Sequence, residues 1–570
     1  MRLWATLALV LAPLACKPAD APPATPQPAP AAIPAPSEPR VTTISIVGTN
    51  DLHGRVHALP LLAGYVENLR AARRRDGGGV LLLDGGDMFQ GTLESNLLEG
   101  SPVRDAYAVM GYDAVAVGNH EFDYGPVGEA ATPTSPDDDP RGALRALAAD
   151  APFPFLTSNL VRSADGERVE WTNMPAQTMV EAAGIPIGII GVSTEDTLRA
   201  THSANVTDLA MTPLAQAIER NARELRDDGA AAVLVVAHAG GTCERFTGDF
   251  EADGCLPDQE IFEVARALPE GTVDVIVAGH THAGVAHDVN AIAIIEQFSY
   301  GRAFGRVDLR FEGSPPRLSG HTIHAPQSLC SQPDDFDYAR CEPSPYEGAP
   351  VERVAAVEEA IAQGAREATA KRNLELGPSL EAPILRAYDR ESALGNLFAD
   401  LLLEAVPGAD VALINGGGLR DDLPAGTLRY GALFLAFPFD NRLASVELSV
   451  ADLKKIWSAH LQRGGGILSV AGLDVRANCK DGALDVELRR GSKRLRDGAK
   501  LTVVASDFMM LGGDGFWGGV TPGEVKLHEA LVRDALQAGL AKRKTLDPAT
   551  LLLEDAPRLR LPQPRPIHCE

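Results

Sequence analysis

The sequence has no cluster of lysine or arginine residues that stands out from its acidic background. Of its 570 residues, 52 are basic and 77 are acidic, which gives a formal net charge of −25. Proteins that bind polymeric nucleic acid do so largely by neutralising phosphates with basic side chains. The composition therefore argues against nucleic-acid polymers as partners. It leaves open a small anionic substrate, provided that bound metal ions reverse the local field.

Long apolar runs are missing after residue 16, and no internal repeat is found. A helix that crosses a membrane needs about 20 consecutive apolar residues, so this part of the chain offers no candidate span. Hydrophobic residues nevertheless make up 45% of the chain, and 570 residues exceed what one hydrophobic core usually supports. We therefore expect two domains.

Cysteine is scarce, and no pair has the CxxC spacing typical of zinc sites. Apart from Cys16 the number of cysteines is even, which favours structural disulfides in an oxidising compartment over thiolate chemistry. The pairs predicted from their short loops are Cys243 with Cys255 and Cys330 with Cys341, with Cys479 and Cys569 left over. The sequence alone does not settle this connectivity.

The first 40 residues differ from the rest in composition. Arg2 precedes an apolar stretch over residues 3–15 that is too short to span a membrane and is typical of a secretory signal. It ends in Pro13-Leu14-Ala15-Cys16, which resembles a bacterial lipobox, although Pro13 departs from the usual aliphatic residue. We expect residues 1–16 to be a signal peptide, with Cys16 lipidated. Plain secretion with cleavage nearby is the alternative.

Residues 17–40 are rich in Pro and Ala, and we expect them to form a semi-rigid linker. The expected location is then the periplasm or cell envelope, with the protein held on a membrane only through the lipid on its N-terminus.

Apolar runs typical of strands alternate with helical patterns in the rest of the chain. The predicted strands are residues 41–47, 80–83, 114–117, 185–192, 232–237, 273–278, 411–414 and 501–505, and the predicted helices are residues 62–74, 143–148, 213–227, 392–404 and 450–462. The alternation indicates an α/β domain over residues 41–325. Residues 326–374 read as a linker with a connecting helix over residues 351–372, followed by a second domain over residues 375–545 and a tail over residues 546–570.

Residue types that bind metal follow five of the apolar runs directly. The segments are Asn50-Asp51-Leu52-His53-Gly54, Gly85-Gly86-Asp87, Gly118-Asn119-His120-Glu121, Ala237-His238 and Gly279-His280-Thr281-His282. Because the carboxyl ends of parallel strands meet in one crevice, these side chains can converge. A single histidine after a strand is more often a packing residue, but five such segments together predict a site for a pair of divalent cations.

Other polar residues near these motifs receive a structural interpretation. His57 and His287 flank the motifs, and we expect both to be solvent-exposed loop residues. The run Asp137-Asp138-Asp139 lacks the spacing and the closing glutamate of a calcium loop, so we expect a solvated loop there.

The motifs resemble those of the 5′-nucleotidase family of binuclear metallophosphoesterases. The matching segments are residues 49–54, 85–87, 118–123, 238, 279–282, 415–420 and 512–515. The resemblance covers nearly all of residues 41–540. It implies a four-layer α/β/β/α sandwich for the first domain, an α+β substrate-binding domain of the nucleotidase type for the second, and a substrate cleft between them.

The resemblance also implies roles for the site residues. One cation would be bound by Asp51, His53, Asp87 and His282, and the other by Asp87, Asn119, His238 and His280. His282 is a departure, because several relatives have Gln or Asn there. His120 and Asp123 match the catalytic dyad, in which the carboxylate holds the ring and favours imidazolium. The cations, whether Zn, Mn, Co or Mg, would activate a hydroxide for attack on phosphorus.

In the second domain the resemblance implies a set of substrate contacts. Phe439 and Phe508 match two aromatic residues that sandwich a base. The other candidates are Asn415, Asn441 and Asp514 for base or ribose, Gly417 in the turn beside Asn415, Arg420 for a phosphate or carboxylate, and Arg390 for a second phosphate contact. Structural alternatives remain open, since a phenylalanine after proline is most often a core residue and residues 415–418 could be a plain turn.

The expected activity is removal of the 5′-phosphate from extracellular nucleotides. Hydrolysis of nucleotide diphosphate-sugars or of 2′,3′-cyclic nucleotides is the first alternative, and the two phenylalanines argue against action on thiosulfate. A catalytically idle, nucleotide-binding surface lipoprotein is the alternative from another class. The presence of every ligand and of both His120 and Asp123 argues against it. The sequence does not determine the metal, the preferred nucleotide or the oligomeric state.

Overall fold

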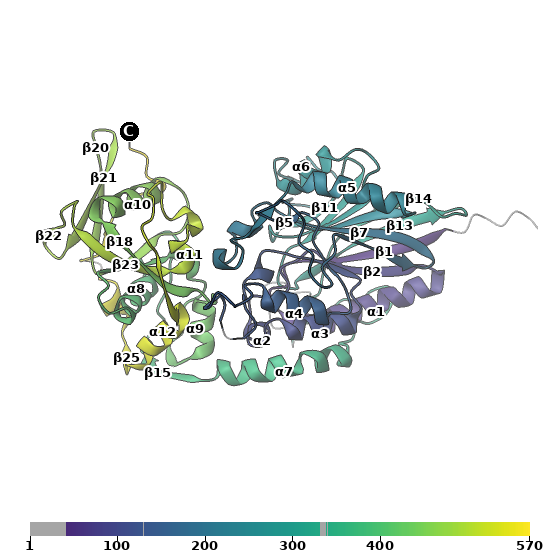
Figure 1. Cartoon of the computed structure of the whole chain (residues 1–570). Coiled ribbons are helices and arrows are strands. Elements are labelled where there is room, and N and C mark those ends of the chain that lie inside the picture. The colour runs from purple at the N-terminus through teal and green to yellow at the C-terminus, as the bar shows by residue number, and fades with distance from the viewer. Residues whose placement is uncertain (1–40, 129, 331–337, 339, 554, 570) are drawn as a thin grey trace, which may run out of the picture. The chain divides into compact units, whose positions relative to one another are not determined.

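The computed structural model describes residues 41–128, 130–330, 338, 340–553 and 555–569 (Figure 1). The predicted signal peptide and Pro/Ala-rich linker lie outside these described residues, as do residues 331–337 of the second linker. In the described part of the chain, no helix combines the length and the apolar character needed to cross a membrane.

Two six-stranded sheets form the first half of the described chain. The first sheet contains, in order, β14 (Arg317–Ser328), β13 (Ala303–Glu312), β1 (Thr42–Thr49), β2 (Gly79–Asp84), β3 (Ala114–Ala116) and β4 (Phe155–Leu156). The second contains β11 (Gly284–Val289), β12 (Ile292–Gln297), β10 (Val275–Ala278), β9 (Ala232–His238), β7 (Ile185–Ser193) and β6 (Gln177–Ala182). Strands β1 to β4 are parallel, as are β7, β9, β10 and β12.

The two sheets pack face to face and are covered by helices on their outer faces. Ile44, Leu81, Ile187 and Val277 belong to the apolar layer between the sheets. Helices α1 (Leu59–Asp76), α3 (Ser101–Met110) and α4 (Gly142–Asp150) cover the first sheet, and α5 (Leu214–Asp227) and α6 (Glu260–Ala267) cover the second. Burial on both faces explains why these strands read as continuous Val, Ile and Leu runs. The predicted α/β/β/α sandwich is confirmed.

Helix α7 (Ala355–Arg372) is the predicted connecting helix, and it packs against α1, α3 and the short α2 (Leu93–Asn96). A mixed five-stranded sheet follows, with the order β19 (Leu468–Ala471), β16 (Val411–Asn415), β23 (Lys500–Ser506), β18 (Arg442–Ser449) and β24 (Lys526–Leu531). Helices α8 (Ala393–Ala405) and α12 (Val532–Ala541) cover one face of it, and α10 (Val450–Gln462) covers the other. This arrangement confirms the α+β class predicted for the second half.

Shorter elements complete the described chain. They are β5 (Leu160–Arg162) with β8 (Leu209–Met211); β17 (Gly426–Arg429), β15 (Glu375–Leu380) and β25 (Thr545–Leu546); β22 (Lys493–Arg494), β21 (Ala483–Arg490), β20 (Asp474–Lys480) and β26 (Leu559–Arg560); and helices α9 (Tyr430–Ala436), α11 (Asp507–Met510) and α13 (Pro548–Leu551). The domain boundaries given above remain a prediction.

One expectation about the flanking histidines is wrong. His287 is not a loop residue: it lies in β11, is fully buried, and places its Nε2 2.8 Å from Asp253 Oδ2. An imidazole can be buried at this position because that carboxylate satisfies it. His57 is exposed as expected, although it lies in a 3₁₀ turn, Val56–Ala58. The Asp137–Asp139 segment lies outside helices and strands, with Asp137 exposed, as predicted.

Three disulfides join the six cysteines that lie in the described part of the chain. Cys243 bonds to Cys255 and Cys330 to Cys341, which confirms both predicted pairs, and Cys479 bonds to Cys569. Only the third bond links residues far apart in sequence, with a separation of 90. It ties β20 to the C-terminal segment.

Replacing Cys479 and Cys569 together by serine is expected to lower the free energy of unfolding by about 2–5 kcal/mol, because the unfolded chain regains the entropy of an open loop. The double serine variant at Cys330 and Cys341, whose separation is 11, should cost about 2 kcal/mol less. Urea denaturation of both variants measures the difference. An equal or larger loss in the short-loop variant would contradict the prediction.

Candidate active site

The predicted metal ligands lie at or just after the carboxyl ends of five strands. Asp51 and His53 follow β1, Asp87 follows β2, and His238 is the last residue of β9. Asn119 follows β3, and His280 and His282 follow β10. Strands β1, β2 and β3 belong to one sheet, and β9 and β10 belong to the other. The convergence therefore arises at the shared end of two packed sheets and not along a single one.

The backbone is unusual at most of these positions. Asp51, His53, Asp87, His280 and His282 all have φ between 48° and 85°, in the left-handed region that non-glycine residues rarely adopt. Each such residue costs about 1–3 kcal/mol, and such residues gather at functional sites, where the surrounding structure holds them. The sharp turn at each residue lets its side chain point back over the end of the sheet.

Asp51, His53 and His282 form one group of potential ligands. The Nε2 atoms of the two histidines are 3.0 Å apart, and His282 Nε2 is 3.4 Å from Asp51 Oδ1. His53 Nδ1 lies 2.9 Å from the carbonyl oxygen of Gln90, which can only accept, so Nδ1 donates. The lone pair of His53 Nε2 therefore faces the group.

Asp87, Asn119, His238 and His280 form a second group. His238 Nε2 is 3.2 Å from Asp87 Oδ2 and 3.0 Å from Asn119 Oδ1, and His280 Nδ1 is 3.1 Å from the same amide oxygen. His238 Nδ1 donates to the carbonyl of Gly85 at 2.9 Å, which leaves its Nε2 as an acceptor. Asp87 Oδ2 is also 3.9 Å from His53 Nε2, so this carboxylate faces both groups.

The two groups turn acceptor atoms toward one another with few donors between them. Asp51 Oδ1 is buried and accepts no hydrogen bond from the residues that the structure describes. Lone pairs gathered in this way repel one another unless a positive charge lies among them. The residues therefore fit divalent cations, and the mixture of carboxylate, amide and imidazole suits Zn, Mn, Co or Mg.

The pKa values of the histidines agree with this interpretation. Burial lowers the pKa of His53 and of His280 to about 4, so both rings are neutral at pH 7, which is the form that binds metal. Burial also acts to lower the pKa of His238, but the charge of Asp87 outweighs it and raises that pKa to about 10. Without a cation, a proton on His238 would therefore compensate the buried carboxylates.

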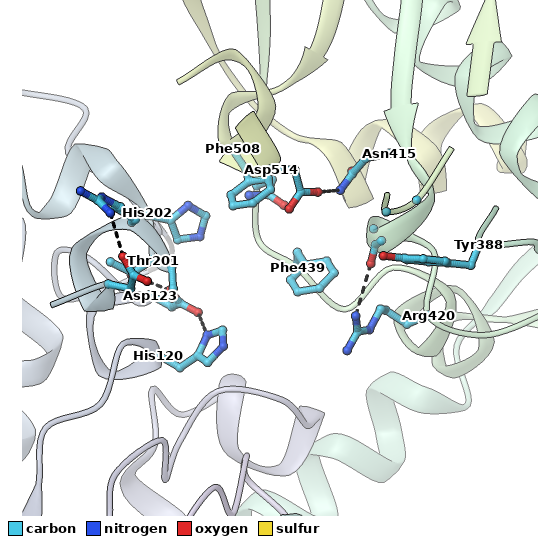
Figure 2. A pocket seen from close by; sticks show the side chains of 18 of the residues that line it. His120, Asp123, Thr201, His202, Tyr388, Asn415, Arg420, Phe439, Phe508 and Asp514 are labelled. Atoms are coloured by element: carbon cyan, nitrogen blue, oxygen red, sulfur yellow. Dashed lines mark hydrogen bonds and ion pairs between the residues drawn. The ribbon is translucent and has the colours of Figure 1, made fainter. Parts of the chain in front are cut away.

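His120 lies beside the two groups and is held by a carboxylate. Its Nδ1 is 2.5 Å from Asp123 Oδ2, and Thr201 donates to the other oxygen of Asp123 at 2.8 Å (Figure 2). Burial alone would lower the pKa of His120, but the charges of Asp123 and Asp87 raise it to about 9. His120 is also close enough to His53 and Asp87 to be counted as a potential ligand. Its Nδ1 is held by Asp123 and His120 lines the cavity described below, so the catalytic role stays the prediction.

Buried Glu121 joins the turns that carry the ligands, and its role was missed in the sequence although it lies within a recognised motif. Its Oε2 accepts from the backbone N–H groups of Asp87 and Gly118 at 2.9 and 2.6 Å, and its Oε1 accepts from Met88 at 2.8 Å. Gly118 must be glycine there, because a Cβ would lie 2.3 Å from Asp87 Oδ1. Burial and the charge of Asp87 raise the pKa of Glu121 to about 8.

A cavity of about 800 Å³ lies beside His120 and Asp123 and is also lined by residues of the second half (Figure 2). The predicted substrate-binding residues that line it are Asn415, Gly417, Arg420, Phe439, Asn441, Phe508 and Asp514. Arg390 does not line it: its side chain is 73% exposed and pairs with Asp389. Arg463, which the sequence reasoning missed, lines the cavity and donates to the carbonyl of Gly515 at 2.8 Å. No motif marked Arg463 in advance.

The lining residues are held by contacts among themselves. Asn415 Nδ2 donates to Asp514 Oδ2 at 2.9 Å, and the Arg420 guanidinium carbon lies 5.8 Å from the centre of the Phe439 ring. Phe439 and Phe508 are both half-buried and remain free to contact a ligand on one side. Flat aromatic faces next to a guanidinium and amide groups suit a planar, anionic molecule.

Each half of the chain matches a known protein family. Residues 44–284 match the calcineurin-like phosphoesterase family, and residues 369–518 match the 5′-nucleotidase C-terminal domain. The chain is 26% identical over 491 residues to endonuclease YhcR of Bacillus subtilis, a match that covers 82% of this chain but only 37% of that longer protein. It is 25% identical over 515 residues to protein UshA of Yersinia enterocolitica, covering 83% of this chain and 86% of UshA.

The fold agrees with these matches. The crystal structure of a 5′-nucleotidase precursor from Thermus thermophilus superimposes with a TM-score of 0.63 at 21% identity, covering 92% of this chain and 100% of that one. The first half thus carries the phosphoesterase architecture with its cluster of Asp, Asn and His side chains, and the second carries the nucleotidase domain. The chain belongs to the 5′-nucleotidase family and is a metal-dependent phosphoester hydrolase.

Proposed function

We propose that this enzyme removes the 5′-phosphate from nucleotides at a site for two divalent cations. The observation that carries the proposal is the position of Asp87 Oδ2, which lies 3.2 Å from His238 Nε2 and 3.9 Å from His53 Nε2. One cation would be held by Asp51, His53, Asp87 and His282, and the other by Asp87, Asn119, His238 and His280. When bound, the cations would supply an activated water and neutralise charge on the phosphoryl group.

The chain's own residues would bind and orient the phosphate. His120 lines the cavity, and its Nδ1 is occupied by Asp123, so its Nε2–H is available to donate to a phosphoryl oxygen. Asp123 and Thr201 fix the ring and keep it positively charged, which offsets negative charge that develops on the oxygens. This role requires no movement of the ring during the reaction.

The second half would select for a nucleotide. Phe439 and Phe508 offer faces on which a base can stack, and Asn415 and Asp514 offer polar groups for the base or ribose. Arg420 is the candidate for a phosphate or carboxylate contact, and the position of Arg463 makes it a better second candidate than Arg390.

Export remains part of the proposal. The three disulfides support it, because such bonds persist in oxidising compartments. Lipidation of Cys16 and attachment to the cell envelope lie outside the described residues. Membrane fractionation of cells that express the wild type or Cys16→Ser tests them: the wild type should stay with membranes and the variant should be released.

Phosphate release from four substrates tests the activity. Purified protein is incubated with AMP, UDP-glucose, 2′,3′-cyclic AMP or bis(p-nitrophenyl) phosphate, each with Mn, Co, Zn or a chelator. Preference for AMP with loss of activity in chelator supports the proposal. Preference for UDP-glucose or for the cyclic diester selects the alternative substrates, and no hydrolysis with any metal would favour an idle binding protein.

Phe439→Ala is expected to raise the KM for AMP by about 5- to 150-fold, which corresponds to about 1–3 kcal/mol for loss of stacking on one base. Ribose 5-phosphate has no base, so its hydrolysis by the variant should stay within about twofold of the wild type. Steady-state kinetics with both substrates measures the contrast. A similar loss with ribose 5-phosphate would show that Phe439 supports the fold and not the base.

A further inference from the structure

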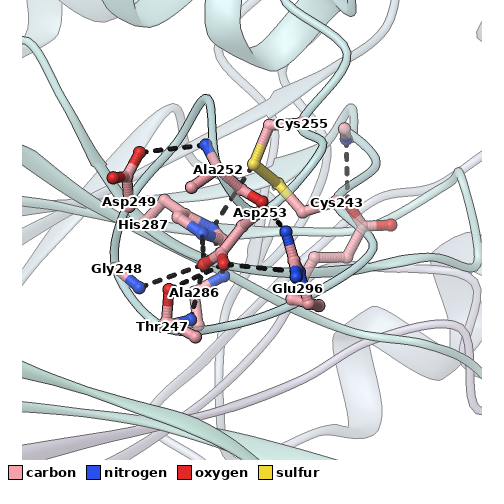
Figure 3. The surroundings of a disulfide bond; sticks show 12 residues. Cys243, Thr247, Gly248, Asp249, Ala252, Asp253, Cys255, Ala286, His287 and Glu296 are labelled. Atoms are coloured by element: carbon pink, nitrogen blue, oxygen red, sulfur yellow. Dashed lines mark hydrogen bonds and ion pairs between the residues drawn. A yellow bond between two sulfur atoms is a disulfide. The ribbon is translucent and has the colours of Figure 1, made fainter.

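A buried histidine that is not among the candidate metal ligands lies against the Cys243–Cys255 disulfide (Figure 3). His287 is fully buried in β11, and its Nδ1 is 3.7 Å from Cys255 Sγ. The two cysteines are 6% and 8% exposed. The phosphohydrolase reaction proposed above makes no use of this cluster.

The protonation of His287 follows from its neighbours. Nδ1 faces the backbone N–H of Ala286 at 3.2 Å, and because that group can only donate, Nδ1 is an acceptor. The proton is then on Nε2, which donates to Asp253 Oδ2 at 2.8 Å. Asp253 is held in turn by the Thr247 hydroxyl at 2.7 Å and the Gly248 N–H at 3.1 Å. Nδ1 therefore carries the lone pair of the ring and lies 3.7 Å from Cys255 Sγ, and a cation bound there would take the place of the Ala286 N–H.

This arrangement is the one that a zinc-binding imidazole adopts, with a carboxylate on its second nitrogen to fix the tautomer. In a tetrahedral zinc site, bonds of about 2.3 Å to sulfur and about 2.0 Å to nitrogen place the two ligand atoms about 3.5 Å apart. The observed distance between Nδ1 and Cys255 Sγ is 3.7 Å, and the ligand atoms of all three residues lie within 4.8 Å of one another. While the Cys243–Cys255 disulfide is closed, the sulfurs cannot act as thiolates.

We propose that reduction of the Cys243–Cys255 disulfide creates a zinc site formed by both sulfurs and His287 Nδ1, with water as the fourth ligand. A dithiol reductant supplies two electrons and two protons, which break the S–S bond into two thiols, and is itself oxidised to a disulfide. One Zn²⁺ then replaces both thiol protons, which pass to solvent. Soft thiolates favour Zn²⁺ over Mg²⁺ at this position.

A zinc ion bound at this site would hold residues 243–255 together, as the disulfide does. The Cys243 N–H donates to the carbonyl of Gly284 at 3.1 Å, and the Thr281 hydroxyl donates to the carbonyl of Gly241 at 2.7 Å. Thr281 lies between His280 and His282, so this segment packs directly on the turn that carries two of the candidate ligands. Zinc would keep the segment in place under reducing conditions, in which an open dithiol would release it.

Cobalt absorption spectra test the proposal. The intact protein is reduced anaerobically with dithiothreitol, desalted and titrated with Co²⁺, while free thiols are counted in parallel. We expect a thiolate-to-cobalt charge-transfer band that saturates at one Co²⁺ per chain, that is absent before reduction, and that Zn²⁺ removes. The oxygen and nitrogen ligands of the active site cannot produce this band, so a failure here leaves the proposed nucleotidase activity unaffected.

Variants separate the new site from the other thiols. His287→Asn should abolish the band, and Asp253→Asn should weaken Co²⁺ binding by about 10- to 100-fold. The double serine variant at Cys330 and Cys341 is the matched control: it removes another short-loop disulfide, with a separation of 11 against 12, and should keep the band. No band from fully reduced protein, an unchanged band in His287→Asn, or a Cys243–Cys255 bond that stays closed when Cys330–Cys341 opens would each overturn the proposal.

Discussion

Asp87→Asn should remove bound metal and lower the rate of phosphate release at least about 10³-fold. Oδ2 of this carboxylate lies 3.2 Å from His238 Nε2 and 3.9 Å from His53 Nε2. Its Oδ1 accepts from the backbone N–H of His120 at 2.8 Å. Asparagine preserves the size and one oxygen but loses the negative charge that both cations would share. Several kcal/mol of charge stabilisation are lost with it, and each 1.4 kcal/mol or so is about tenfold in rate.

Metal content is the decisive measurement for this variant. Inductively coupled plasma analysis of the wild type should give about two equivalents of divalent metal after loading, and Asp87→Asn should give less than one. Asp137→Asn is the matched control, because Asp137 is exposed and belongs neither to the ligand groups nor to the cavity lining, and it should retain both metal and activity. Full metal content in an inactive Asp87→Asn variant would contradict the bridging role.

His120→Asn should reduce turnover by about 10²- to 10⁴-fold and leave the metal content unchanged. The loss is expected because asparagine cannot carry the positive charge that Asp123 maintains on the ring, where the pKa of His120 is raised to about 9. The effect should fall mainly on kcat, since the charge interacts most strongly with the oxygens as the phosphoryl group is transferred.

The same substitution at a second histidine provides the control. His57 is exposed and lies 3.3 Å from Glu94, and it is not among the residues that line the cavity, so His57→Asn should have nearly normal kinetics. If metal content falls together with activity in His120→Asn, the ring is a ligand, as its proximity to His53 and Asp87 would allow, and the catalytic assignment is wrong.

Strand positions were predictable because their cause is local. A strand buried on both faces needs apolar side chains at every position, so β2, β9 and β10 appear in the sequence as unbroken runs of Val, Leu, Ile and Ala. Gly86 marks a sharp turn with φ of 96°, and polar residues after such a turn stand out from the run before it. The types of the candidate ligands and their order could therefore be read directly, and the family resemblance then suggested their roles.

The errors occurred where a side chain depends on a partner far away in sequence. His287 was expected to be exposed, but Asp253 provides the partner that makes its burial possible. Arg390 was named as a candidate and Arg463 was not, although of the two side chains only that of Arg463 lines the cavity, which also receives Tyr388 from the segment of Arg390. Glu121 had no assigned role because its acceptor function depends on the N–H groups of Asp87 and Met88, which belong to another strand and turn.

Local sequence was thus sufficient to place the strand ends and to identify the chemistry of the groups that follow them. The packing of two separate sheets decided that groups after β1, β2 and β3 meet those after β9 and β10. It also decided which histidines are neutral and which are charged, because their pKa values depend on burial and on carboxylates contributed by other segments. Residue type and spacing are properties of a short stretch of chain, whereas distance, burial and charge environment exist only once distant stretches have packed together.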